Sequence, residues 1–315
     1  MKLKYAHLKN GNFGDDLNPW LWPQCAPELF DGDDNVQFLG IGTILHRHYP
    51  ASTLKVVFSS GAGYRRAPIL DESWRVYCVR GKLTARLLGV SPDLAVGDGA
   101  YLLRQLRLLE AAPVAGRVGF MPHHASLRYL DWAGLCERAG LTYLDPCAPV
   151  AETLRRISSC SLVLAEAMHA AIVSDALRIP WVAVRYSHRF LDSKWHDWLS
   201  AFDLDLVIHD MPAVLDAQLP FKELLKRRLR SPLAHLPLAP ARWRRMPCRR
   251  ATATELDGAA EWLAALATSA VPQMTSEPAL ARVEQRLDEK LQKLRADFAA
   301  GLLIAPQPNP TAGVS

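Results

Sequence analysis

The sequence of residues 160–185 is CSLVLAEAMHAAIVSDALRIPWVAVR. Its apolar and β-branched runs predict buried strands at Ser161–Ala165 and Trp181–Arg185, and the residues between them predict a helix over Met168–Leu177. A strand, a helix and a second strand in this order are typical of parallel pairing, because the helix carries the chain back along the sheet. This segment therefore favours an α/β fold.

The same alternation extends over most of the chain on both sides of this segment. Further strands are expected at Leu3–Leu8, Val36–Leu39, Leu54–Ser59, Trp74–Val79, Arg117–Met121, Leu141–Leu144 and Leu204–Ile208. Further helices are expected at Asp16–Cys25, Lys82–Leu88, Ala100–Leu109, Leu127–Ala139, Val150–Ser159, Lys194–Phe202 and Glu255–Ala267. Two such sets meet near Ala111–Gly116, so we expect two Rossmann-like parallel sheets that face a cleft.

We expect four segments along the 315 residues. They are an N-terminal Rossmann-like domain, a C-terminal Rossmann-like domain, a basic and helical extension and a disordered tail, over residues 1–112, 113–210, 211–300 and 301–315. In the extension, apolar residues from Leu280 to Phe298 recur at three- and four-residue steps behind Ser276. This spacing predicts a helix with one apolar stripe, which can pack on the body of the protein or pair with a partner helix, and we favour packing on the body.

The net charge of +5 is unevenly distributed. Residues 222–250 contain ten Lys or Arg and one Glu, which leaves −4 for the rest of the chain. Leu224, Leu225 and Trp243 are interleaved with these cations, a composition that suits an anionic membrane surface. A solvated basic face or a linker is the alternative. Nucleic acid is not expected as a partner, because no nucleic-acid-binding motif accompanies the cations.

The six cysteines are scattered, and no two of them have the two-residue gap of a zinc or redox motif. We expect neither a metal nor a cofactor. No apolar run is long enough to cross a bilayer, and the N-terminus lacks the pattern of a secretory signal. These patterns favour a protein of the reducing cytoplasm, with peripheral membrane contact through the basic segment.

Polar and glycine-rich loops follow the predicted strands of the first half. Asn12, Asp15 and Asp16 follow the first strand, where they can face a ligand or simply cap the next helix. Gly61 and Gly63 follow the third strand, where their backbone N–H groups can approach an anion. Ligands of open α/β sheets bind beyond the carboxyl ends of the strands, so all these residues are site candidates.

Basic side chains also follow several strands. Arg80 follows the fourth strand and Arg185 ends the last core strand, and each can hold a phosphate or carboxylate or form a surface ion pair. His123 and His124 follow the strand at Arg117–Met121. Two adjacent histidines are too few for a metal site, so we expect a base or a hydrogen-bond donor to a phosphate.

Glu166 and His169 lie where the first strand of residues 160–185 turns into the helix. Burying a carboxyl and an imidazole at this point is costly unless they have partners or a function. A satisfied structural pair and a catalytic pair both fit the pattern, and we favour a site role for His169.

Several short motifs occur in a distinctive order. They are Asn-Phe-Gly-Asp at 12–15, Gly-x-Gly turns at 40–42 and 61–63, Val-Arg-Gly at 79–81, Gly-Asp at 97–98, Pro-His-His at 122–124 and Glu-Ala-Met-His at 166–169. Over residues 1–200 this order resembles the polysaccharide pyruvyl transferase family, especially its succinoglycan-type ketal pyruvyltransferases of bacterial exopolysaccharide synthesis. The resemblance implies a fold like glycosyltransferase type B, phosphoenolpyruvate as donor, and a polyprenyl-linked sugar as acceptor at the cytoplasmic face of the inner membrane.

The resemblance places His169 at the family's late histidine and Arg80 at its arginine after a first-domain strand. We expect His169 to act as general acid or to hold phosphate, with Glu166 orienting it or serving as a base. We expect donor binding by Arg80, Arg185, His123, His124, Gly61 and Gly63, and acceptor binding by Asn12, Asp15 and Asp16.

The chain departs from the family pattern at two places. Ala167 stands where many members have arginine, and Asp98-Gly99 stands where many have Asp-Pro. Arg185 and Arg189 are the candidates to replace the missing arginine.

Two other functions fit the same pattern. A nucleotide-sugar glycosyltransferase of this fold also places cations and a Glu or His beside its cleft. A non-catalytic, membrane-associated subunit of a polysaccharide machine would instead use the basic segment and the C-terminal helix to hold partners.

Overall fold

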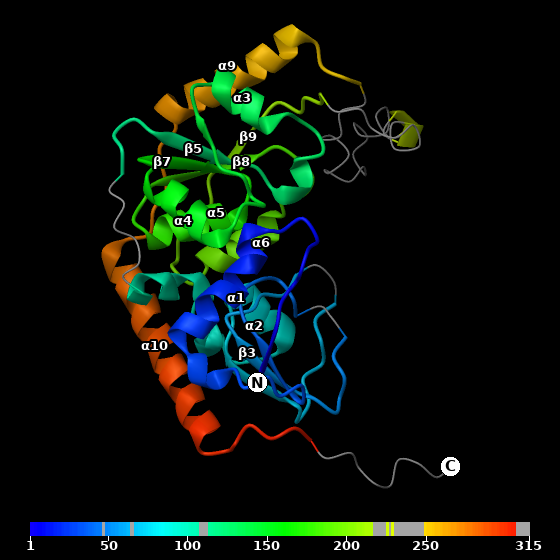
Figure 1. The fold of residues 1–315 in the computed structure, drawn as a ribbon, viewed down its shortest axis with the longest axis vertical. Coiled ribbons are helices and arrows are strands. Elements are labelled where there is room, and N and C mark those ends of the chain that lie inside the picture. The colour runs from blue at the N-terminus through cyan, green and yellow to red at the C-terminus, as the bar shows by residue number, and fades with distance from the viewer. Residues whose placement is uncertain are drawn as a thin grey trace. The chain divides into compact units, whose positions relative to one another are not determined.

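The computed structural model describes residues 1–45, 48–63, 66–106, 113–216, 225–226, 228–229 and 249–306. It is an α/β structure with two parallel sheets and helices beside them (Figure 1). The chain divides into two compact units. The first unit comprises residues 1–108, 193–205 and 275–315, and the second unit comprises residues 109–192 and 206–274. These units differ from the predicted continuous ranges, because two later segments return to the first unit.

The sheet of the first unit contains β1 (Lys2–Lys4), β2 (Val36–Leu39), β3 (Leu54–Phe58) and β4 (Trp74–Cys78) in that order, and every neighbouring pair is parallel. The central strands β2 and β3 are buried along their whole length. A parallel sheet covered on both faces needs such strands, with few polar residues. The loops that follow the four strands therefore lie at one edge of this sheet.

The helices of the first unit are α1 (Phe13–Cys25), α2 (Lys82–Leu88), α6 (Asp192–Leu199) and α10 (Glu277–Ala299), with the 3₁₀ helices η1 (Pro27–Leu29), η2 (Pro92–Leu94) and η3 (Gly99–Leu106). All of α6 except its first residue belongs to this unit. The first unit thus takes helices from three separate parts of the chain.

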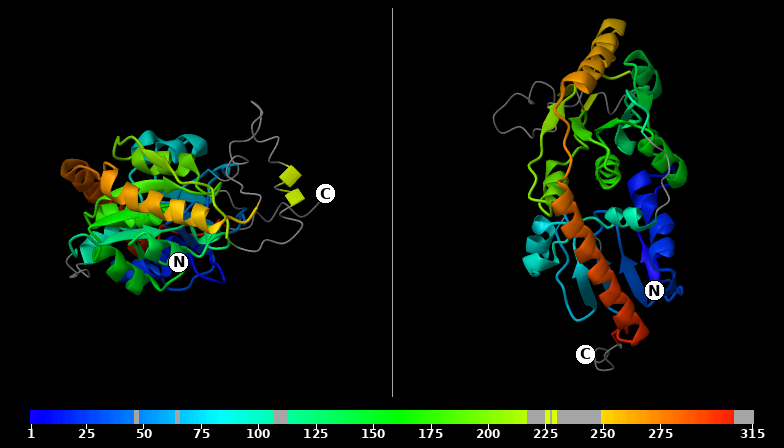
Figure 2. Two further views of the ribbon diagram at one scale, coloured as in Figure 1. Left: turned by 90° about the horizontal axis from the view of Figure 1, so that it is seen from above. Right: turned by 90° about the vertical axis from the view of Figure 1, so that its left-hand side faces the viewer.

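The C-terminal helix α10 has the boundaries and the buried stripe that its spacing predicts. The Ser276 hydroxyl accepts the N–H of Ala279 at its start (3.4 Å). Its buried residues are Ala279, Leu280, Val283, Leu287, Leu291 and Leu294. The helix packs beside β4 and η3 (Figure 2), and the Tyr77 hydroxyl donates to Asp297 (2.7 Å). The prediction that this helix packs on the body is confirmed.

The sheet of the second unit contains β6 (Thr142–Tyr143), β5 (Val118–Met121), β7 (Leu162–Ala165), β8 (Trp181–Arg185) and β9 (Ile208–Asp210) in that spatial order. Every neighbouring pair is again parallel. The two strands predicted within residues 160–185 are β7 and β8, so their parallel pairing is confirmed.

The helices of the second unit are α3 (Trp132–Arg138), α4 (Val150–Ser158), α5 (Met168–Ala176) and α9 (Ala253–Ser269), with the 3₁₀ helix η4 (His124–Ser126). α3 and α9 pack together on one face of the sheet, and α4 and α5 lie on the other (Figure 1). Successive side chains of a strand point to opposite faces. Leu162 and Leu164 accordingly share one core cluster with Trp132 and Leu263.

Two predicted helices differ from the structure. The segment predicted as a helix from Ala100 forms the 3₁₀ helix η3 instead. The helix predicted from Leu127 begins only at Trp132, because the Asp131 carboxylate caps it by accepting the Gly134 N–H (3.1 Å).

Most of the predicted membrane-binding segment, residues 222–250, lies outside the described residues. At its end, Arg249 pairs with Glu255, and Arg250 pairs with Asp216 (2.8 Å). Residues 301–315, predicted to be disordered, are described only to residue 306. None of the helices in the described part of the chain is long and apolar enough to cross a membrane.

The glycine of β5 gives a test of the packing in the second unit. A Cβ at Gly119 would lie 2.7 Å from Leu144 Cδ1 and 2.8 Å from Cys160 Sγ. Gly119→Ala is therefore expected to lower the free energy of unfolding by about 1–3 kcal/mol, measured by urea denaturation. A Cβ at Gly258, which is exposed in α9, would meet nothing within 4 Å. Gly258→Ala should therefore raise the free energy of unfolding by about 0.5–1 kcal/mol. A Gly119→Ala protein as stable as the parent would contradict this packing.

Candidate functional site

The N-terminus of α1 lies at the carboxyl edge of the first sheet and carries three predicted acceptor-binding residues. The backbone N–H of Asn12 donates to Asp16 (2.8 Å), and its side-chain amide donates to Asp15 (2.6 Å). All three residues are half-buried. The structure therefore brings Asn12, Asp15 and Asp16 together, with capping contacts among them.

The buried side chain of Asn18 joins α1 to the loop after β2. Its amide donates to the carbonyl oxygens of Asp15 (2.9 Å) and Ile41 (3.0 Å), and its oxygen accepts the Ile41 N–H (2.8 Å). A Cβ at Gly42 would lie 3.2 Å from the Asp15 carboxylate. The loop after β2 therefore lies directly beside Asp15.

Lys194 of α6 brings a cation to the same carboxylate. Burial lowers the pKa of its ammonium to about 8, and the attraction of Asp15 opposes that shift. A half-buried lysine with such a pKa can exchange a proton near neutral pH.

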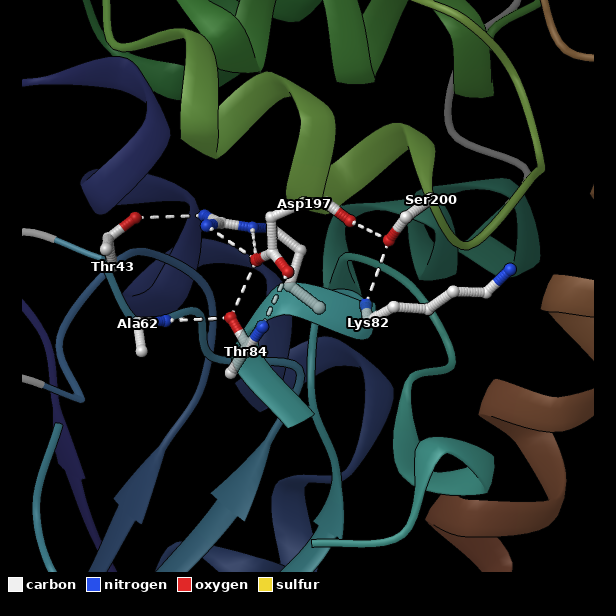
Figure 3. Close-up of polar contacts among 7 residues, drawn as sticks. Thr43, Ala62, Lys82, Thr84, Asp197 and Ser200 are labelled. Carbon is white, nitrogen blue, oxygen red and sulfur yellow. Dashed lines mark hydrogen bonds and ion pairs between the residues drawn. The ribbon is translucent and has the colours of Figure 1, made fainter. Parts of the chain in front are cut away.

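Arg80 follows β4 and is completely buried. Its Nε donates to the Asp197 carboxylate (3.0 Å), and its Nη2 forms an ion pair with the same carboxylate (2.9 Å). Its Nη1 donates to the Thr43 hydroxyl (2.9 Å; Figure 3). A Cβ at Gly61 would lie 2.3 Å from the guanidinium, so only glycine leaves room for it. Arg80 and Gly61, both predicted to bind the donor, thus contact each other, and the guanidinium is paired within the first unit.

The Asp197 carboxylate gathers further groups. It accepts the Thr84 backbone N–H (2.8 Å) and hydroxyl (2.7 Å), and Thr84 in turn accepts the Ala62 N–H (2.9 Å; Figure 3). The loops after β2, β3 and β4 are therefore tied to α6 through one carboxylate. Gly63, also predicted to bind the donor, has a φ of +134° and no atom within 4 Å of a Cβ position.

Glu166 plays the corresponding part at the carboxyl edge of the second sheet. It is buried at the end of β7 and accepts the His123 N–H (2.8 Å), the Ser126 hydroxyl (3.0 Å), and both the Ser187 N–H (3.1 Å) and hydroxyl (2.9 Å). Burial raises the pKa of its carboxyl, and these hydrogen bonds oppose the rise. Glu166 thus joins the loops after β5 and β8, and none of these bonds goes to His169.

His123 and His124 form a close pair on the loop after β5, with ring centroids 4.3 Å apart. Nδ1 of His123 accepts the Ala125 N–H (3.1 Å). Burial is the largest cause that lowers the pKa of His123 to about 3, and the charges of His124, Arg189 and His188 contribute to the same shift. His169 lies in the first turn of α5 and is half-buried in the same unit.

The two candidate arginines of the second unit differ in their partners. Arg185 pairs with Asp210 through Nε (2.7 Å) and Nη2 (3.1 Å) and with Asp192 through Nη1 (2.7 Å). Arg189 is exposed, and its side chain forms no ion pair with the described residues. Of the two, Arg189 has the guanidinium that a substrate anion can pair with.

Two comparisons with known proteins identify the family. Residues 39–188 match the family described as polysaccharide pyruvyl transferase. The succinoglycan biosynthesis protein ExoV of Rhizobium meliloti (strain 1021) is 31% identical over 318 residues, which cover 95% of this chain and 100% of that protein. The chain belongs to the polysaccharide pyruvyl transferase family. It is therefore related to a family of transferases, as the motif order indicated.

The family match includes strands of both sheets. In this pyruvyl transferase family member, Arg80, His123, Glu166, His169 and Arg185 lie within the matched residues, whereas Asn12, Asp15 and Asp16 precede them. Among the described residues, no group of three or more His, Cys, Asp or Glu side chains is placed to hold a metal ion.

Sequence reasoning missed four residues that hold these loops: Asn18, Ser126, Ser187 and Asp197. Asp197 had a readable signal, because it lies between two tryptophans, Trp195 and Trp198, on a predicted helix. An acid among large apolar residues is costly to bury without a partner, which predicts a buried cation nearby. The two serines had no such signal, because Ser is ordinary in loops.

The buried ion pair predicts a large loss of stability when one partner is removed. Arg80→Ala leaves the Asp197 carboxylate buried without its cation, which is expected to cost about 3–5 kcal/mol. Urea denaturation followed by tryptophan fluorescence measures the loss. Replacing both partners, Arg80→Met with Asp197→Leu, should cost less than either single change to alanine. Lys82→Ala, which removes an exposed pair with Asp203, is the control and should change little.

Proposed function

We propose that this protein transfers a pyruvyl group from phosphoenolpyruvate, as a ketal, to a sugar of a bacterial exopolysaccharide repeat. The observation that carries the proposal is family membership, which rests on the family match over residues 39–188 and on a relative, described as a succinoglycan biosynthesis protein, that aligns with 95% of the chain. The basic and imidazole groups at the edge of the second sheet support an anionic donor. A glycosyltransferase-B-like arrangement of the two units is part of this proposal.

The proposed reaction consumes two sugar hydroxyls and releases phosphate. A general acid protonates the methylene carbon of phosphoenolpyruvate, which makes C2 electrophilic. One sugar hydroxyl adds to C2, and the second displaces phosphate. One of the two hydroxyl protons leaves with the phosphate, and the other returns to the general acid. This chemistry requires an acid, a base for the hydroxyls and cations for the phosphate and carboxylate.

We assign the acid to His169 and the anion-binding charge to Arg189. His123 and His124 lie on the neighbouring loop and would donate to the phosphate or carboxylate. In the first unit, Asp15 and Asp16 would accept from the sugar hydroxyls. Glu166, Arg80 and Arg185 would act by position, because their charged groups already have protein partners.

We also propose a polyprenyl-linked acceptor and peripheral contact with the cytoplasmic face of the inner membrane. The charge of residues 222–250 supports this proposal, since clustered Lys and Arg are attracted to anionic lipid.

The donor and the acid are tested together. Incubation with phosphoenolpyruvate and a glycan acceptor should release phosphate only when the acceptor is present, and mass spectrometry should show one pyruvate ketal per modified sugar. His169→Ala should lower the transfer rate by about 10²–10⁴-fold, because a general acid is lost. His196→Ala, an exposed histidine of α6, is the control. Transfer from a nucleotide sugar instead would overturn the proposed function.

The choice between the two arginines predicts different defects. Arg189→Ala should raise KM for phosphoenolpyruvate by about 10–100-fold, because a hydrogen bond between charged groups is lost. The urea midpoint of this variant should be unchanged. Arg185→Ala should lower the urea midpoint, because Asp192 and Asp210 lose their shared cation. Arg155→Ala, an exposed arginine of α4, is the control for both. An unchanged KM in Arg189→Ala would move the anion-binding role to another residue.

A further inference from the structure

The imidazole of His123 is held in one protonation state by its surroundings. The backbone N–H of Ala125 points at Nδ1 (3.1 Å), and a backbone N–H can only donate. Nδ1 therefore carries a lone pair, and the proton of the ring is on Nε2. Within the described part of the chain, Nε2 has no hydrogen-bond partner, and the residue is half-buried. One N–H donor is thus left for a ligand.

The groups around His123 oppose a positive charge on it. The tilted ring of His124 lies beside it, and His188 and Arg189 on the loop after β8 also act on its charge. Burial is the largest cause of the low pKa of His123, and these neighbours add to it. The Glu166 carboxylate accepts the backbone N–H of His123 and no ring proton. The ring therefore stays uncharged through the neutral pH range.

Glu166 fixes where this donor lies. One of its oxygens accepts the His123 N–H, and the other accepts from Ser126 and Ser187. Ser187 also accepts the Arg189 N–H (3.2 Å), so one carboxylate sets both the His123 loop and the Arg189 loop.

We propose that His123 binds the substrate as an uncharged donor, through Nε2–H to an anionic oxygen, and that Glu166 is the residue that positions it. This inference rests on the proposed function, because it takes the phosphate or carboxylate of phosphoenolpyruvate as the anion. An uncharged donor adds a directed hydrogen bond, while Arg189 supplies the charge.

Nitrogen NMR of the full chain labelled in histidine tests the protonation state. The His123 signals are identified by their loss in His123→Gln. From about pH 5 to pH 8 they should show that Nε2 carries a proton and that Nδ1 carries none. A titration midpoint near the ordinary histidine value, or a proton on Nδ1, would overturn the inference.

The same spectra test the ligand. Phosphoenolpyruvate should shift the Nε2–H signal, and inorganic phosphate and pyruvate, added separately, assign the contact to the phosphate or to the carboxylate. An unmoved signal with all three probes would overturn the binding role.

Glu166→Gln tests the positioning role. The amide presents a donor where the His123 N–H needs an acceptor, so His123 should show both ring tautomers or titrate in the measured range. Asp175→Asn, which alters another buried carboxylate of this unit that accepts from Trp181 (3.1 Å), should leave the His123 signals unchanged. If Glu166→Gln does not fold, Ser187→Ala removes one donor and should produce the same change to a smaller extent. Unchanged His123 signals in these variants would overturn the positioning role.

Kinetics separate this inference from the proposed function. His123→Phe should raise KM for phosphoenolpyruvate by about 10–100-fold, and His123→Gln, which keeps an uncharged N–H donor, by less than about tenfold. A protein without any pyruvyl transfer refutes the proposed function, whereas normal transfer with a charged His123 refutes only this inference.

Discussion

The buried ion pair between Arg80 and Asp197 is the contact on which the first unit depends. Neither side chain is exposed, and each would be an uncompensated charge without the other. Because Asp197 is on α6, the chain must return to the first unit between β8 and β9, before the last strand of the second sheet is added. The pair also explains two glycines, since a Cβ at Gly61 would meet the guanidinium and one at Gly81 would lie 1.7 Å from the Asp197 carbonyl oxygen.

The second unit solves the same problem without a cation. Glu166 is as buried as Asp197, but backbone N–H groups and hydroxyls satisfy it instead of a guanidinium. Each unit thus has a buried carboxylate, Asp197 or Glu166, that joins loops from different strands at the carboxyl edge of its sheet. Such a carboxylate holds loops in place because leaving any of its donors unpaired would be costly.

The sequence predicted the helices and strands that follow from local periodicity, but not the side-chain contacts between residues far apart in the chain. Parallel strands around residues 160–185 and the stripe of α10 follow from periodicity, which neighbouring residues determine. The partner of Arg80 is more than a hundred residues away, and no local pattern identifies it. Glu166 was expected to orient His169 or to serve as a base, and its hydrogen bonds go to the loops after β5 and β8. A polar residue beside a buried strand indicates that it has hydrogen-bond partners, but it does not indicate which residues these are.

The departure from the family at Ala167 has a physical counterpart in this unit. An arginine at that position would be the N-cap residue of α5, directly after Glu166. Two carboxylates hold all the guanidinium nitrogens of Arg185, one of the two candidates to replace it. Arg189 is exposed, and its N–H is bound to Ser187, which Glu166 holds in turn. Glu166, the residue directly before Ala167, therefore also fixes the loop that carries Arg189, the cation proposed to replace the missing arginine.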